Sequence, residues 1–536
     1  MSPRGSVLLG VGGLTLAARV VGFGRSLVFS KTVGDTCLGD VYNAANALPN
    51  VLFEVAAGGV LAGVVVPVVA RHLGAGRRAE ADRTTSALLS WTLLVLTVVA
   101  VAALLGAGLY ASAYAKADCA GSTGVLTALV VMFVPQVWFY GVAVVSAGVL
   151  QAHGRFLAAA TAPLVSSVVV IAGYVVFAGL AAPGAGSELG LLSRPALLAL
   201  GLGTTAGVVA LALCTALPLA RLGARVRPSL RFAPGDARVV ASIGAAGLAG
   251  LVLQQVSVLV VNLAAQRSPD PGALTRLTWA NALYLLPYAV LAAPVLQLTF
   301  PRLAAAAGRG GDEVARVVRR TAPPLVVLSW LGAALLAATA VPVARVFVLG
   351  PGSGRTDALA GPVAALAPAV LGFALMGLAT RTLLAQHRAL AAGTTTALAW
   401  GTVTAAALVA AAVAPPGTLV VALAGSVSLG LAVGGVVGWV ALSRRASARP
   451  GVVPALLAGA VAAGLAVLAG GALARPAADV GLLGAAGLAL AAAVTTTVVF
   501  VGVLAVVRRP LLAATWALRR PDPADEPHDE TRAARA

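Results

Sequence analysis

Residues 156–182 read FLAAATAPLVSSVVVIAGYVVFAGLAA, a stretch without a single charged side chain. A helix of about 20 apolar residues is long enough to cross the hydrocarbon core of a bilayer. The apolar residues form a continuous run and do not alternate with polar ones, so the stretch does not resemble a strand of a membrane barrel. It therefore predicts a transmembrane helix.

Similar runs follow one another from end to end of the 536-residue chain, which is 60% hydrophobic and only 10% charged. A soluble domain needs far more charge to cover its surface. The many glycines (61) and prolines (30) are tolerated in membrane helices. We predict an all-α integral membrane protein of about fourteen transmembrane helices, with spans near 5–30, 38–70, 84–112, 122–151, 156–182, 192–221, 237–266, 274–304, 318–348, 358–386, 389–413, 417–442, 451–473 and 479–507.

Basic residues are distributed unequally between the loops on the two sides of these spans. Of the 37 Lys and Arg residues, 27 lie on the side of the N-terminus and two, Arg19 and Arg25, lie inside the first span. The eight on the other side are Lys31, Lys116, Arg194, Arg267, Arg276, Arg345, Arg355 and Arg475. Because cytoplasmic loops are the basic ones, both termini are predicted to be cytoplasmic, in a plasma membrane. The net charge of +19 then reflects topology and contact with membrane lipids, not nucleic-acid binding.

The N-terminal segment superficially resembles a secretory signal, because Arg4 precedes an apolar run to Ala18. Arg19 and Arg25 follow where a cleavage region would be small and neutral, so we interpret it as a retained first helix. The cysteines, Cys37, Cys119 and Cys214, show no metal-binding spacing, and no cofactor is expected. Cys37 and Cys119 both fall near predicted outer loops, and either a disulfide between them or two inert thiols fits this pattern.

An internal repeat is visible at an offset of 233 residues. LQAHGRFLAA at 150–159 aligns with LLAQHRALAA at 383–392, and Pro135 aligns with Pro368. The offset covers six spans, so the two copies share one orientation, as in transporters with a central site between two lobes. The predicted parts are an N-lobe (1–230, helices 1–6), a C-lobe (231–446, helices 7–12), two further helices (447–509) and a disordered cytoplasmic tail (510–536).

Charged side chains inside the spans are candidates for function, because a charge at the centre of a membrane helix costs about 2.5–3.5 kcal/mol on insertion scales. Arg19 and Arg25 lie in the first span and Asp40 and Glu54 in the second. A guanidinium is suited to bind phosphate oxygens with two parallel hydrogen bonds. The arginines could instead reach toward an interface or pair with Asp40, and Asp40 could instead cap the second helix.

Four polar residues of the second span, Asp40, Asn43, Asn46 and Asn50, are spaced so that they share one helical face. A polar stripe in an apolar helix needs water, a ligand or another helix to satisfy it. We therefore predict that Arg19, Arg25, Asp40, Asn43, Asn46 and Asn50 bind substrate. No cluster with metal-ligand spacing and no nucleophile–base pair is visible, so an enzyme is not predicted.

The first two spans resemble the MurJ/MviN family of the multidrug/oligosaccharidyl-lipid/polysaccharide exporter superfamily. The resemblance rests on ARVVGFGR at 18–25, GDVYNAANALPN at 39–50 and VPQVWFYG at 134–141, the last being closest to the actinobacterial branch. It implies fourteen helices, two lobes and a cationic cavity that moves lipid II, a peptidoglycan precursor linked to undecaprenyl diphosphate, from the inner to the outer leaflet. Cell-wall synthesis proteins are the partners it suggests.

Residue by residue, the resemblance carries over to Arg19, Arg25 and Asp40. The basic residues that follow Leu-Pro-Asn in other members fall here at Phe53 and Glu54, and the arginine of the eighth helix falls at Ala282. Two alternatives to a flippase stay open at this point. One is a cation-coupled small-molecule exporter related to the MATE proteins, and the other is a transport-inactive paralogue that acts as a scaffold.

Overall fold

The computed structural model describes residues 3–116, 118–223, 226–443 and 452–517, and this part of the chain is helical without any β-strand. Its first half contains α1 (Pro3–Thr32), α2 (Cys37–Phe53), η1 (Glu54–Gly58), α3 (Gly59–Gly74), α4 (Arg78–Leu105), α5 (Ala107–Tyr114), α6 (Ser122–Phe133), α7 (Gln136–Ala152), α8 (Phe156–Leu180), η2 (Leu189–Leu191) and α9 (Arg194–Arg221). Its second half contains α10 (Asp236–Gln266), α11 (Ala273–Pro287), η3 (Tyr288–Ala292), α12 (Ala293–Ala307), α13 (Gly311–Ala338), α14 (Ala340–Val348), α15 (Thr356–Ala365), α16 (Ala367–Ala385), α17 (Ala389–Val413), η4 (Pro416–Thr418), α18 (Leu419–Ser443), α19 (Val452–Ala474), η5 (Arg475–Asp479) and α20 (Leu482–Ala517).

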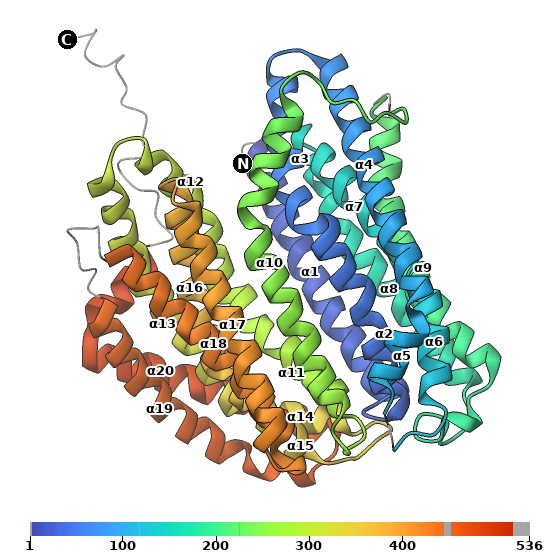
Figure 1. Cartoon of the computed structure of the whole chain (residues 1–536). Coiled ribbons are helices and arrows are strands. Elements are labelled where there is room, and N and C mark those ends of the chain that lie inside the picture. Colours follow the sequence, from blue (N-terminus) through green and yellow to red (C-terminus); the bar gives the residue numbers. More distant parts are fainter. Residues whose placement is uncertain (1–2, 117, 224–225, 444–451, 518–536) are drawn as a thin grey trace.

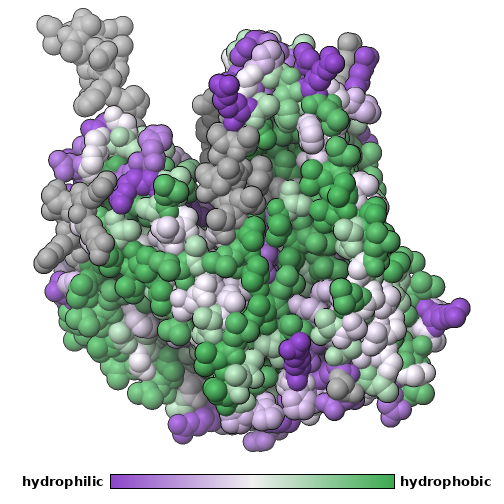
Figure 2. All heavy atoms as spheres, in the orientation of Figure 1, coloured by the Kyte–Doolittle hydropathy of each residue, from purple (hydrophilic) through white to green (hydrophobic). Residues whose placement is uncertain are grey.

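The helices have the length and composition of membrane spans. Within the described residues, eleven helical segments are long and apolar enough to cross a bilayer, and Gly63–Gly74 and Gly250–Gln266 are shorter apolar helices. Hydrophobic side chains cover the middle of the molecule, and hydrophilic ones gather at its two ends (Figure 2). The all-helical membrane fold is thus confirmed. Each predicted span overlaps one helix or a run of consecutive helices, but the number of fourteen crossings stays a prediction.

The repeat seen in the sequence recurs in the helix boundaries. α8 and α17 start at Phe156 and Ala389 and end at Leu180 and Val413, so both ends differ by the offset of 233. A π-helical turn interrupts each copy at the same place, η1 between α2 and α3 and η3 between α11 and α12. Proline precedes both turns, which is the expected cause of such an interruption.

Equivalent helices also pack in equivalent ways. In the first half α8 packs against α1 and α9, and α7 packs against α9; in the second half α17 packs against α10 and α18, and α16 against α18. α19 and α20 pack against each other and against α13. The α8–α9 contact is close because Gly173 and Gly203 face each other, and a Cβ on Gly203 would lie 2.8 Å from the Cα of Gly173. Such small residues let membrane helices approach.

The two halves meet at the end that carries α14 and α15, and they diverge toward the end that carries the α3–α4 connection (Figure 1). α10 packs against both halves, through α3 in the first and α17 in the second. The predicted lobe boundary at 230 falls in the connection between α9 and α10, the one at 446 lies outside the described residues, and both stay predictions. The predicted start of the tail is wrong for 510–517, because α20 continues past a kink at Arg508 to Ala517; residues 518–536 lie outside the described part.

Candidate functional site

A cavity of about 740 Å³ lies between the two halves. Its walls come from α1, α2, α8 and α9 of the first half and from α11 and α14 of the second, with Tyr140 of α7. The site is thus built where the two repeats face each other, as expected for a transporter made of repeats. Five of the six residues predicted to bind substrate line it, namely Arg19, Arg25, Asn43, Asn46 and Asn50.

Arg19 and Arg25 are the only charged side chains among the described residues that line the cavity. Arg19 is exposed and Arg25 is half-buried. In the part of the chain that the structure describes, neither guanidinium makes a hydrogen bond or an ion pair. Arg25 lies near enough to the hydroxyls of Tyr42, Tyr140 and Tyr174 to act on them electrostatically. Two unpaired cations in an otherwise neutral cavity make it attractive to an anion.

The three asparagines of α2 line the cavity, and the Asn43 side chain also links the two halves. The Asn43 amide donates to the carbonyl of Gly39 at 2.9 Å and to Thr275 Oγ1 of α11 at 3.1 Å. The Asn50 amide donates to the carbonyl of Asn46 at 2.7 Å. The amide oxygens stay available for a ligand in the cavity, so the stripe offers acceptors beside the arginine donors.

Aromatic side chains form much of the remaining wall. Phe347 of α14 contacts Phe23 of α1 and Trp279 of α11, with ring centroids 5.7 and 5.3 Å apart. On the other side, the Tyr42 hydroxyl lies 2.7 Å from that of Tyr174 and 2.9 Å from Thr204 Oγ1. These hydroxyls satisfy one another inside the first half, so this wall is fixed before any ligand enters.

The sequence indicated Ala282 only through the family resemblance and did not single out Trp279 and Leu286, although a signal for all three positions was present. α2 starts at Cys37 and α11 at Ala273, and the same difference of 236 carries Asn43, Asn46 and Asn50 onto those three positions. All six line the cavity. The repeat therefore identifies the α11 face even though its residues are not polar.

Asp40 is the exception among the predicted site residues, because it does not line the cavity in this structure. Its side chain is completely buried, and its partner is Lys116, 2.9 Å away, not Arg25. The expected pairing with Arg25 is therefore absent from this conformation. The expectation that Asp40 caps its own helix is also wrong, since Thr36 accepts the hydrogen bond from Gly39 N at the start of α2.

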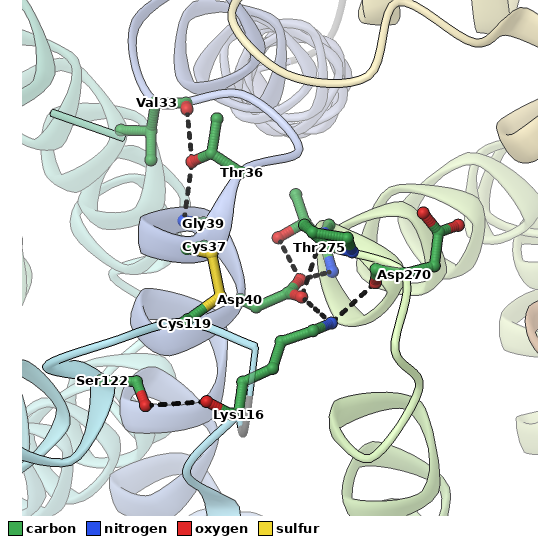
Figure 3. The surroundings of a disulfide bond; sticks show 12 residues. Val33, Thr36, Cys37, Gly39, Asp40, Lys116, Cys119, Ser122, Asp270 and Thr275 are labelled. Carbon is green, nitrogen blue, oxygen red and sulfur yellow. Dashed lines mark hydrogen bonds and ion pairs between the residues drawn. A yellow bond between two sulfur atoms is a disulfide. The ribbon is translucent and has the colours of Figure 1, made fainter. Parts of the chain in front are cut away.

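The Asp40 carboxylate instead caps α11 of the second half (Figure 3). Oδ2 accepts from the backbone N–H of Gly272 and Oδ1 from that of Thr275, both at 2.9 Å, and Oδ1 also accepts from Thr275 Oγ1 at 3.0 Å. These N–H groups belong to the first turn of α11, where the helix dipole favours a negative charge. Sequence spacing could not show this contact, because the two segments are more than 230 positions apart.

A second buried ion pair lies at the same end of the molecule. Arg276 Nη1 donates to Asp35 Oδ2 at 2.9 Å, Arg276 also pairs with Asp270, and Ser353 Oγ donates to Asp35 Oδ2 at 2.5 Å. The backbones approach closely here, because a Cβ on Gly34 would lie 1.7 Å from the carbonyl oxygen of Pro351. The two halves are therefore sealed against each other at this end. We call these contacts (of 33–36 and 40 with 270–276 and 350–353) the outer seal, after the side on which the distribution of basic residues predicts this end to lie.

Known proteins resemble this chain in both sequence and fold. A family model described as lipid II flippase MurJ matches residues 29–477. The probable lipid II flippase MurJ of Rhizobium meliloti (strain 1021) is 28% identical over 371 residues, which cover 66% of this chain and 65% of that protein. The lipid II flippase MurJ of Burkholderia cenocepacia is 28% identical over 306 residues, which cover 56% of this chain and 57% of that protein. The two alignments thus span 65% and 57% of these relatives, less than two thirds of each.

Solved structures agree on the fold. The lipid II flippase MurJ in an inward closed conformation superposes with a TM-score of 0.71 at 15% identity, over 94% of this chain and 99% of that one. An inward-facing multidrug resistance MATE family transporter of the MOP superfamily gives 0.65 at 15% identity, over 82% and 99%. Because the family model matches most of its length, the chain belongs to the lipid II flippase MurJ family.

Proposed function

We propose that the chain moves a lipid-linked anionic substrate, lipid II or a close relative, across the plasma membrane by alternating access between its two halves. The observation that carries this proposal is the pair of unpartnered arginines in a cavity between the repeats. A diphosphate has oxygens on several sides, and a guanidinium can bind two of them at once. The neutral amides of α2 and the ring of Trp279 suit an uncharged, polar part of the same substrate.

Two independent observations support the orientation that we propose for the chain. The predicted inner loops hold most of the basic residues, which favours the cytoplasm. At the opposite end, Cys37 and Cys119 form a disulfide, and disulfides persist outside the reducing cytosol. We therefore propose that the outer seal lies on the outer side of the membrane and that both termini lie on its cytoplasmic side. The cavity would then receive substrate from the inner side in this conformation.

A cation-coupled small-molecule exporter is the alternative within the same superfamily. Such an exporter needs a carboxylate at its binding site to exchange a proton or a cationic drug. Among the described lining residues there is none, since Asp40 lies in the outer seal and Glu54 lies in η1 outside the lining. The charge of the cavity therefore favours an anionic substrate over a cationic one.

The decisive experiment is growth rescue. We expect this chain, produced in a bacterium depleted of its own lipid II flippase, to restore growth and the appearance of labelled lipid II on the outer leaflet. Membrane insertion at the level of the host flippase without either result would leave the scaffold alternative. Rescue of drug export without rescue of growth would instead support the exporter. Partners among cell-wall synthesis proteins stay a prediction of the family resemblance.

A further inference from the structure

The connection between α5 and α6 carries a lysine into the outer seal. The Lys116 ammonium is 1% exposed; it donates to Asp40 Oδ2 at 2.9 Å and to the backbone carbonyl of Asp270 at 2.6 Å (Figure 3). Asp40 belongs to α2 of the first half, and Asp270 belongs to the α10–α11 connection of the second. One ammonium group therefore contacts both halves at the point where they close.

A disulfide holds the segment that carries this lysine. Cys119 is joined to Cys37, with the two Cα atoms 5.9 Å apart, and both residues are buried. Cys37 is the first residue of α2, so the covalent link lies within one helical turn of Asp40. The carbonyl of Lys116 also accepts from the N–H of Cys119 at 3.1 Å and from Ser122 Oγ at 3.2 Å. The loop is thus fastened to the helix that presents the carboxylate.

If the two halves separate at this end, some of these contacts are kept and others break. Lys116, the disulfide and Asp40 all belong to the first half and would move together. The hydrogen bonds from Gly272 and Thr275 to Asp40, and from Lys116 to the Asp270 carbonyl, cross between the halves and would break. Water would then reach Asp40, so its charge would need the lysine only while the seal is closed and dry.

We propose that Lys116 is a positioning residue for transport, held in place by the Cys37–Cys119 disulfide, and that it stabilises the outer-closed state by neutralising Asp40 inside the seal. The inference rests on the proposed alternating access. Among the described residues Lys116 is the only cation paired with Asp40, and a buried carboxylate that loses such a partner is strongly destabilised. Removal of the ammonium therefore shifts the balance toward an open outer end. Because the disulfide forms only after this end reaches an oxidising compartment, the seal reaches full strength only in the inserted, oxidised protein.

The test measures opening of the outer end directly and does not depend on a lipid substrate. A single reporter cysteine replaces Ala282 in the cavity, Cys214 is changed to Ser, and a membrane-impermeant maleimide is applied from outside intact cells. We expect Lys116→Met to raise the labelling rate at least about tenfold, given the usual cost of breaking a buried pair. Asp40→Asn combined with Lys116→Met should return the rate toward the starting value, since no charge is then left buried.

Lys31→Met is the matched control. Lys31 also reaches the second half, by donating to the carbonyl of Val346 at 2.5 Å, but it pairs with no carboxylate of the described residues. Its removal should raise labelling much less than the removal of Lys116. Equal effects of the two substitutions would overturn the proposal, as would an unchanged rate in Lys116→Met.

The role of the disulfide is tested in the same assay. Cys37→Ser with Cys119→Ser should increase labelling in the chain that keeps Lys116, and should add little when Lys116→Met is already present. Full additivity of the two changes would show that the disulfide does not act through the lysine. Labelling could respond as expected while lipid export is absent from every variant. The role of Lys116 in the seal would then be supported and the proposed lipid substrate would be wrong, so failure of one proposal can be told from failure of the other.

Discussion

His72 Nε2 lies 2.8 Å from Asp236 Oδ2, and this contact joins the first helix of the second repeat to the inner end of the first. Asp236 is completely buried at the start of α10; it also pairs with Arg71 and accepts from Thr84 Oγ1 at 2.5 Å. The other imidazole nitrogen, Nδ1, lies 3.0 Å from Glu80. The end opposite the outer seal is thus also tied across the repeats, through α10.

Asp236→Asn should weaken this attachment, because the amide cannot accept from three donors as the carboxylate does. We expect a loss of about 1–3 kcal/mol of stability, seen as a lower midpoint of thermal unfolding in detergent. Asp82→Asn, on the neighbouring α4, is the control, since no ion pair of its side chain is seen in the described structure. Equal shifts of the two midpoints would contradict a specific role for Asp236.

Arg25→Ala should abolish lipid export while the protein still inserts into the membrane, because the half-buried guanidinium faces the cavity without a protein partner. Arg25→Lys should recover only part of the activity, since an ammonium keeps the charge but lacks the planar pair of donors. The measurement is the outer-leaflet level of labelled lipid II at matched protein abundance. Full export by the alanine variant would remove the central support for an anionic substrate.

Gly34→Ala should prevent the outer seal from closing. Gly34 has φ +74°, and a Cβ there would lie 1.7 Å from the Pro351 carbonyl oxygen of the other half. Gly76→Ala is a well-matched control, because Gly76 has φ +71° but no atom within 4 Å of the added carbon. Both variants bear the strain of about 1–2 kcal/mol for a left-handed residue. Only Gly34→Ala should also raise outside labelling of a cavity cysteine, and similar labelling of both would show that backbone strain alone is responsible.

The orientation of the chain can be checked with two surface cysteines. A cysteine at Ala181, after α8, should react with an impermeant maleimide applied to intact cells, because this connection lies at the end with the disulfide. A cysteine at Arg77, in the basic α3–α4 connection, should react only after the cells are opened. The reverse pattern would invert the topology, and with it the direction of transport.

Much of the architecture was predictable because the bilayer restricts what a chain can do. A polypeptide in hydrocarbon must satisfy its own backbone, so apolar runs such as 156–182 can only be helices. The repeat was readable because Pro135 and Pro368, which disturb helices, recur at one offset. Arg19, Arg25 and the asparagine stripe were found for the same reason, since polar groups at this depth are costly unless a cavity accepts them.

The position of Asp40 in the structure could not be predicted in this way. It shares one helical face of the second span with the asparagines, yet it lies in the outer seal and not in the cavity. Its partners come from two separate segments: Lys116 lies in the α5–α6 connection, and Gly272 and Thr275 lie at the start of α11. Single-sequence spacing describes one helix face, but it does not say which other segment faces it. The contribution of Phe347 to the cavity wall was missed for the same reason.

The sequence by itself determined that this is a helical membrane protein built from two parallel repeats, because hydrophobic length and helix-breaking residues act locally and are written along the chain. Only the tertiary structure decided which polar residues face the cavity and which close the seal. That choice depends on contacts between segments far apart in sequence, where a buried carboxylate such as Asp40 is stable only if a cation and helix N–H groups converge on it.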